Sequence, residues 1–170
     1  IVIAREIFQR MNNFIVYRIA ATLQLLIFFF IAVFAFHPVD YVEIWPDFFH
    51  MPVLMLMLIT LLNDGTLITI AYDYAVASSP PDRWNLPAIF LTSSVLGAVS
   101  CSSSLLLLYF LLDSWNPSGF FQYLGMSEVQ YGQIISAMYL KVSVSDFLTL
   151  FCARTGSRFF WRIKPAPILL

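Results

Sequence analysis

The sequence predicts an all-α membrane protein with four transmembrane helices and a cytosolic stalk on the first of them. Of its 170 residues 60% are hydrophobic and 11% are charged, whereas soluble domains carry about 25% charged residues. Four apolar stretches are long enough to cross a bilayer. The net charge of -1 argues against a nucleic-acid partner, which requires a basic face or stripe. The lipid bilayer is therefore the first expected partner.

The first predicted helix combines a stalk, residues 1–13, with a span over residues 14–36. Ile3, Ile7 and Met11 recur at helical spacing in the stalk, and polar residues occupy its other positions. No Gly or Pro separates the two parts. We therefore expect one continuous rod, roughly 50 Å long at 1.5 Å per residue. The alternative is an amphipathic helix lying on the membrane surface.

The second predicted span, residues 51–72, holds a carboxylate within an apolar stretch. Pro52 suits its first turn, where a missing N–H does no harm. An aspartate at membrane depth costs free energy and marks a functional site on an ion or proton path by default. Asp64 is therefore the predicted proton-binding residue. A structural Asp64, bonded across helices or capping a helix after a break at Gly65, is the alternative.

Four neighbouring residues are predicted to support this proton path. Asn63, Gly65 and Thr66 flank Asp64, and we expect Gly65 and Thr66 to let the second span loosen there. Gln24, in a first span without carboxylates, lies at a similar predicted depth and is expected to meet Asp64. Burial favours the protonated acid, whereas water or a nearby cation favours the carboxylate. Alternation between these surroundings would move a proton.

The third predicted span, residues 87–112, carries small residues every four positions. One row contains Ser93, Gly97 and Cys101, and a second contains Ser94, Ala98 and Ser102. Small residues at this spacing allow another helix to approach closely. Residues 102–104 are consecutive serines without a base nearby in the sequence, so helix packing is favoured over nucleophilic chemistry.

The fourth predicted span, residues 133–152, contains Lys141 and Asp146 as possible charge partners in the membrane. Five residues apart, they differ by about 140° around a helix and should not pair with each other. Lys141 is expected to snorkel outward or to meet a carboxylate. For Asp146 and Lys141, a structural role between helices and a part in transport both stay open.

The basic residues predict the orientation of the chain. The predicted outer loops, residues 37–50 and 113–132, contain no Lys or Arg. The positive-inside rule therefore places both termini in the cytosol. Residues 153–170 are expected to form a cytosolic loop leading to a further, truncated span, so both ends look like cuts through a longer protein. The bases on the predicted inner side are Arg5, Arg10, Arg18, Arg83, Arg154, Arg158, Arg162 and Lys164.

Three motifs carry a family resemblance over almost the whole chain. REIFQRMNNFIVYR at 5–18, LLNDGTLITIAYD at 61–73 and SSPPDRW at 78–84 resemble the P-type proton-transporting ATPases of plant, fungal and protist plasma membranes. The tail at 139–161 looks like the protist branch. The resemblance implies the fifth to eighth helices of a ten-helix domain, with Asp64 as proton acceptor. A fifth-helix arginine of the plant-type pumps would fall at Gln24, so this chain departs from the family pattern. A mechanism in which that arginine displaces the released proton or blocks its return would here need Lys141 or a residue outside the fragment instead.

The resemblance also implies partners that lie beyond these residues. The full-length pump would bind ATP and Mg²⁺, and the motifs DKTGT and TGES of its catalytic domains are absent here. The fragment is therefore expected to bind no cofactor or metal and not to be catalytic alone. Its expected partners are the bilayer, the remaining helices and cytosolic domains of the same chain, and protons, with the plasma membrane as location.

The sequence leaves two alternative functions open. A related Ca²⁺ or Na⁺/K⁺ pump would need more oxygen ligands, since a dehydrated Ca²⁺ takes six to eight. The first two spans supply one carboxylate, Asp64. A four-span channel subunit or membrane scaffold would use Asp64 and the serine-rich third span for packing alone.

Overall fold

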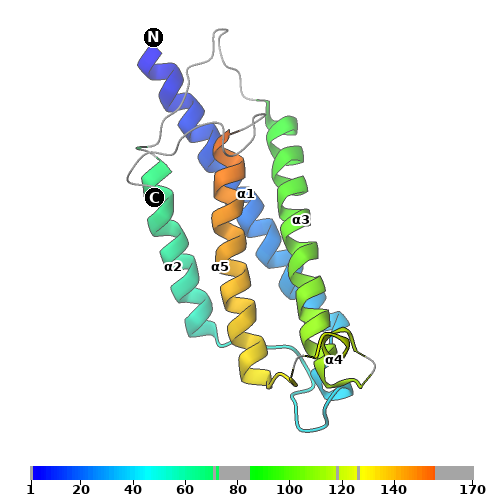
Figure 1. Ribbon diagram of the computed structural model, residues 1–170. Coiled ribbons are helices and arrows are strands. Elements are labelled where there is room, and N and C mark those ends of the chain that lie inside the picture. Colours follow the sequence, from blue (N-terminus) through cyan, green and yellow to red (C-terminus); the bar gives the residue numbers. More distant parts are fainter. Residues whose placement is uncertain (1, 71, 73–84, 118, 126, 156–170) are drawn as a thin grey trace.

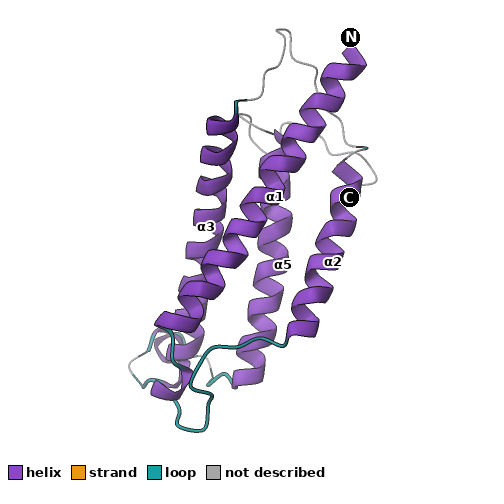
Figure 2. Cartoon of the chain, turned by 180° about the vertical axis from the view of Figure 1, so that it is seen from behind, coloured by secondary structure: helices purple, strands orange, loops and turns teal. Residues whose placement is uncertain are grey.

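A computed structural model describes residues 2–70, 72, 85–117, 119–125 and 127–155. Four long helices lie side by side with alternating directions (Figures 1 and 2). The all-α fold class is confirmed, because the described residues contain helices and no strands. The long helices are α1 (Val2–Ala35), α2 (Val53–Ile70), α3 (Leu86–Leu112) and α5 (Tyr131–Thr155); the short ones are η1 (Pro38–Asp40), η2 (Asp113–Trp115) and α4 (Phe120–Tyr123).

Three helical segments are long and apolar enough to cross a membrane: Val2–Ala35, Leu86–Trp115 and Tyr131–Thr155. The helix α2 has 18 residues, or about 27 Å at 1.5 Å per residue, slightly less than a hydrocarbon core of about 30 Å. The predicted second span therefore corresponds to the shortest of the four long helices, and the four-span count stays a prediction.

The helix α1 runs without a break through the junction between the predicted stalk and span. At this junction Asn13 is buried, and its Nδ2 donates a hydrogen bond to the backbone oxygen of Arg154 at 3.1 Å. The start of α1 and the end of α5 lie at the same end of the bundle (Figure 1). This half of α1 is thus tied to α5 by a buried hydrogen bond.

The closest packing in the bundle joins α1 to α3. Ser93, Gly97 and Cys101 are buried, and a Cβ on Gly97 would lie 3.0 Å from the backbone oxygen of Ala20. Ser93 Oγ lies 3.1 Å from the backbone oxygen of Val16 and donates to it. The row that starts at Ser93 therefore contacts α1, and the other row (Ser94, Ala98 and Ser102) is exposed among the described residues.

Gly97→Val should destabilise the full-length protein. Its added methyl groups would meet the backbone of α1, which cannot rotate away as a flexible side chain does, and overpacking of this kind costs about 1–3 kcal/mol. We expect a lower melting temperature for the detergent-solubilised protein. Ala98→Val, on the exposed row, is the matched control. Equal melting temperatures for the two variants would contradict close α1–α3 packing.

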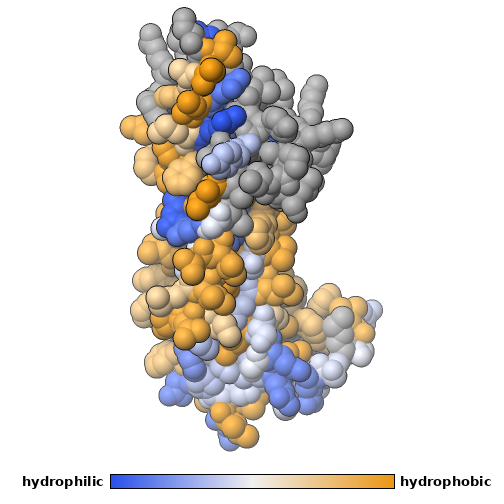
Figure 3. Space-filling model, turned by 90° about the vertical axis from the view of Figure 1, so that its left-hand side faces the viewer, coloured by the Kyte–Doolittle hydropathy of each residue, from blue (hydrophilic) through white to orange (hydrophobic). Residues whose placement is uncertain are grey.

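The helix α2 packs mainly on α5 and makes few contacts with α1. Seen from the α2 side, apolar side chains cover most of the middle of the molecule (Figure 3). Hydrophilic side chains gather at the lower end, with a smaller group higher up the same face. A broad apolar surface bordered by a polar end is the pattern expected of a protein in contact with a bilayer.

Candidate functional site

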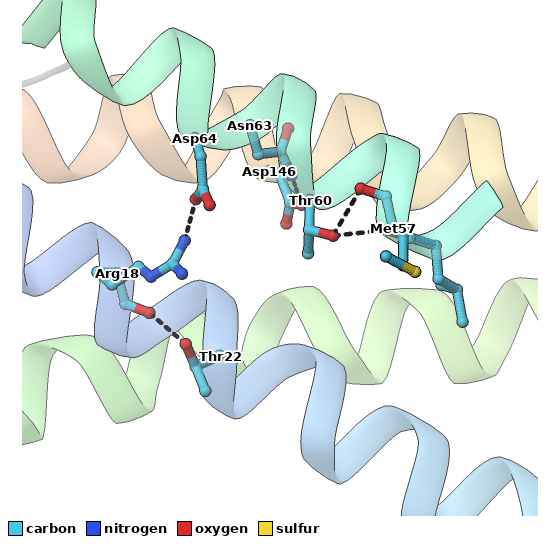
Figure 4. Close-up of polar contacts among 8 residues, drawn as sticks. Arg18, Thr22, Met57, Thr60, Asn63, Asp64 and Asp146 are labelled. Atoms are coloured by element: carbon cyan, nitrogen blue, oxygen red, sulfur yellow. Dashed lines mark hydrogen bonds and ion pairs between the residues drawn. The ribbon is translucent and has the colours of Figure 1, made fainter. Parts of the chain in front are cut away.

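Asp64 forms an ion pair with Arg18, which links α2 to α1. Arg18 Nη1 donates to Asp64 Oδ1, and Figure 4 shows the two side chains pointing toward each other across the gap between the helices. About half of each side chain is exposed among the described residues, 49% for Arg18 and 48% for Asp64. The predicted proton-binding carboxylate therefore has a cation as its immediate partner.

Arg18 was not predicted as this partner from the sequence. The charge pattern grouped Arg18 with the bases of the inner side, although the residue lies four positions inside the predicted span of residues 14–36. A cation within a span needs a partner as much as an anion does. The position of Arg18 inside the span was therefore the sequence signal that it needs a partner. Its backbone oxygen accepts a hydrogen bond from Thr22 Oγ1 at 2.8 Å, one helical turn later.

Gln24 does not hydrogen-bond Asp64, so the expectation that they meet was wrong. Its side chain is 1% exposed, and neither Oε1 nor Nε2 has a hydrogen-bond partner among the described residues. The backbone nitrogen of Gln24 lies near Gly97 of α3. The reason is rotational: six residues separate Gln24 from Arg18, which turns it away from α2 by about 120°.

The helix α2 continues through Gly65 and Thr66 to Ile70. Asp64 is therefore not the cap of a helix that starts after a break, and the described structure shows no loosened turn beside it. The surroundings of Gly65 are open, since a Cβ there would meet nothing within 4 Å. The side chain of Thr66 lies outside the described residues. A role for Gly65 and Thr66 in movement stays a prediction.

Asn63 and Asp146 form a second polar contact, between α2 and α5. Asn63 Nδ2 donates to Asp146 Oδ2, and both residues are buried, with Asp146 at 0% exposure. The second carboxylate oxygen, Oδ1, has no hydrogen-bond partner among the described residues. The contact places Asp146 level with Asn63, the residue before Asp64.

Lys141 contacts a serine and forms no ion pair with a carboxylate among the described residues, so the expected carboxylate partner is not found, whereas an outward course of its side chain stays a prediction. Its Nζ donates to Ser104 Oγ of α3 at 3.2 Å. Ser104 in turn donates to the backbone oxygen of Ser100 at 2.9 Å. Lys141 is distant from residues 102–104 in the sequence but contacts this serine run in the folded chain. The contact joins α3 to α5.

Two grooves lie between α1 and α2, on either side of the ion pair. The upper groove has a volume of about 870 Å³ and lies toward the start of α1 and the end of α2. The lower groove has a volume of about 890 Å³ and lies toward the loop that joins the two helices. Arg18 lines both grooves. Residues of the upper groove include Ile7, Arg10, Phe14, Asp64 and Leu67, and those of the lower groove include Tyr17, Thr22, Thr60, Asn63 and Asp146.

The two carboxylates of the site lie in different grooves. Asp64 faces one groove and Asp146 the other. The described residues include no group of three or more His, Cys, Asp or Glu residues that could hold a metal. Carboxyl groups are among the side chains that exchange protons in proteins.

Comparison with curated proteins shows similarity along nearly the whole chain. It is 51% identical to "Probable proton ATPase 1B" and to "Probable proton ATPase 1A" of Leishmania donovani, in each case over 98% of this chain. It is 30% identical to "Probable plasma membrane ATPase" of Dictyostelium discoideum over 95% of this chain. The chain spans 18%, 18% and 14% of these relatives. No family model matches.

Proposed function

Because this chain belongs, as a segment, to the P-type plasma-membrane proton ATPases, we propose that it is part of the membrane domain of an ATP-driven proton pump. Asp64 binds the transported proton. The observation that carries this proposal is the ion pair between Asp64 and Arg18, located between the two grooves.

The position of Asp64 supports a proton as the transported ion. In the upper groove the carboxylate is open to exchange with one side of the bundle. Arg18 stabilises the charged form, whereas separation from Arg18 in an apolar groove favours the protonated acid. A movement that changes the distance between α1 and α2 therefore changes how tightly Asp64 holds its proton.

The described carboxylates support a proton over a larger cation. Asp64 is engaged by Arg18, and Asp146 by Asn63. A dehydrated Ca²⁺ needs six to eight oxygen ligands, commonly from several carboxylates. An arginine placed against the carboxylate also repels a second cation. This charge arrangement favours the proton over Ca²⁺, Na⁺ or K⁺ and gives Asp64 more than a packing role.

The rest of the pump follows from the same proposal. The predicted stalk at the start of α1 faces the cytosol, and both termini of this segment lie on that side. Other domains of the full-length chain bind ATP and Mg²⁺ and hydrolyse the nucleotide, while α1 transmits their movement to Asp64. The plasma membrane is the proposed location, and the remaining helices of the same chain are its partners there.

ATP-dependent acidification by the full-length protein in sealed vesicles tests this function. We expect the lumen of inside-out vesicles to acidify on addition of Mg²⁺ and ATP, at a rate that does not depend on added Ca²⁺, Na⁺ or K⁺. Acidification that requires one of these cations would instead identify a cation pump. A protein that moves ions without ATP would be a channel subunit, and the proposal would be wrong.

A further inference from the structure

The contact between Asn63 and Asp146 is a second buried polar site beside Asp64. Asp146 comes from α5 and has no exposed surface. Figure 4 shows its side chain and that of Asn63 pointing toward each other, while Asp64, the next residue of α2, points to Arg18. One helix therefore presents consecutive residues to two different partners, one on α1 and one on α5.

Asp146 has few polar partners that could stabilise a negative charge. Its Oδ1 has no hydrogen-bond partner and its Oδ2 accepts from an uncharged amide. Among the described residues no ion pair reaches it. A buried carboxylate without a counter-ion is costly in an apolar environment, and protonation removes that cost. A neutral acid keeps one carbonyl oxygen, which can still accept the amide hydrogen of Asn63.

The cations near Asp146 are engaged elsewhere. The titratable and charged groups around it are Tyr17 and Arg18 of α1, Asp64 of α2, Cys101 of α3 and Lys141 of α5. Arg18 pairs with Asp64, and Lys141 donates to Ser104. Neither cation forms an ion pair with Asp146.

The two carboxyl groups face different grooves. Asp64 lines the upper groove, at the predicted cytosolic side, and Asp146 lines the lower groove, toward the predicted outer loops. Thr22 and Thr60 line the lower groove with it, which gives water or a proton polar groups along the way. Arg18 lines both grooves.

We infer that Asp146 is a second proton-binding residue, which receives the proton on the release side of Asp64 and passes it to the lower groove. This inference rests on the proposed function. When Asp64 gives up its proton beside Arg18, the carboxylate of Asp146 takes it and becomes the neutral acid. It later returns the proton to water in the lower groove and regains its charge, so each transfer moves one proton. Asn63 holds Asp146 in place for both steps.

Asp146→Asn in the full-length protein tests the inference on the lumenal side of inside-out vesicles, where Asp146 would release its proton. The amide keeps the size and one oxygen of the acid but holds no exchangeable acidic proton. Transport in inside-out vesicles is measured while the lumenal pH and the ATP-side pH are varied separately. We expect the pH of half-maximal transport on the lumenal side to shift by at least about one unit, a tenfold change in proton affinity. The ATP-side dependence should change less.

Ser145→Ala is the matched control, because Ser145 is the preceding, buried residue of α5. It should leave the lumenal pH dependence unchanged. A purely structural Asp146 would lower the amount of folded protein in the asparagine variant without moving the lumenal pH profile of the molecules that fold. An unchanged profile in folded Asp146→Asn would overturn the inference.

A measurement on the unmodified protein covers the case in which the variant does not fold. Dicyclohexylcarbodiimide reacts with protonated carboxyl groups in apolar surroundings, and mass spectrometry of peptides locates the adduct. We expect modification at Asp146 that falls as the pH is raised. Absence of an adduct at Asp146 at every pH would overturn the inference.

The two proposals fail in distinguishable ways. If the unmodified protein does not acidify vesicles with ATP, the proposed function is wrong. If it acidifies them, while Asp146→Asn keeps the normal lumenal pH profile, the function stands and the role of Asp146 is wrong.

Discussion

Asp64→Asn should abolish ATP-driven proton transport by the full-length pump. The amide fills the same volume and can still accept a hydrogen bond from Arg18, but it cannot bind and release a proton at neutral pH. We expect the rate of vesicle acidification to fall by at least about 10²-fold, the lower end of what a positioned acid or base contributes. The measurement is acidification per phosphorylated enzyme, which corrects for any difference in the amount of folded protein.

Asp47→Asn supplies the control, because it makes the same change in an exposed position of the loop between α1 and α2. Its acidification rate should match that of the unmodified protein. Asp64→Glu keeps a carboxyl group and should retain part of the activity. Full pumping by Asp64→Asn would remove Asp64 from the proton path.

Arg18→Gln should produce the second-largest loss of transport. It removes the positive charge that faces Asp64, so the carboxylate loses the partner that stabilises its charged form. Asp64 then releases its proton less readily, and the release step slows. We expect the acidification rate to fall by about tenfold, the change that about 1.4 kcal/mol in the barrier to proton release produces.

Arg18→Lys tests whether the charge is what matters. Lysine keeps the cation but loses the planar group with five donors, so this variant should recover much of the activity that Arg18→Gln loses. The acidification rate of each variant, measured per phosphorylated enzyme, separates the two outcomes. Equal losses in both variants would show that Arg18 acts by shape rather than by charge.

Much of the fold could be predicted from composition and spacing. The absence of Gly and Pro between residues 1 and 36 predicted a continuous helix, and α1 runs unbroken from Val2 to Ala35. The row of Ser93, Gly97 and Cys101 predicted a close helix contact, which α1 supplies. The sequence did not show which of the two small-residue rows would be buried. That choice depends on the rotation of α3 against α1, which local spacing leaves undetermined.

The sequence predicted the central residue of the candidate site but not the partners of its polar residues. Asp64 stands out as a carboxylate in an apolar stretch, whereas its partner depends on the angle at which α1 faces α2. Gln24 and Arg18 both lie on α1, and only the packed structure shows that Arg18 faces Asp64 while Gln24 faces inward. The same holds for Lys141 and Asp146, whose partners Ser104 and Asn63 lie on other helices.

The packing of the four helices is uneven and leaves α2 the least tightly held. The helices α1, α3 and α5 pack against one another, with α1 closest to α3 at Gly97, whereas α2 rests mainly on α5 and makes few contacts with α1. The salt bridge of Arg18 and Asp64 is a polar link between α1 and α2. A movement of α1 relative to α2 therefore strains this link, while the bond from Asn63 to Asp146 stays between α2 and α5. Mechanical work delivered to the start of α1 would thus reach a titratable group on the neighbouring helix.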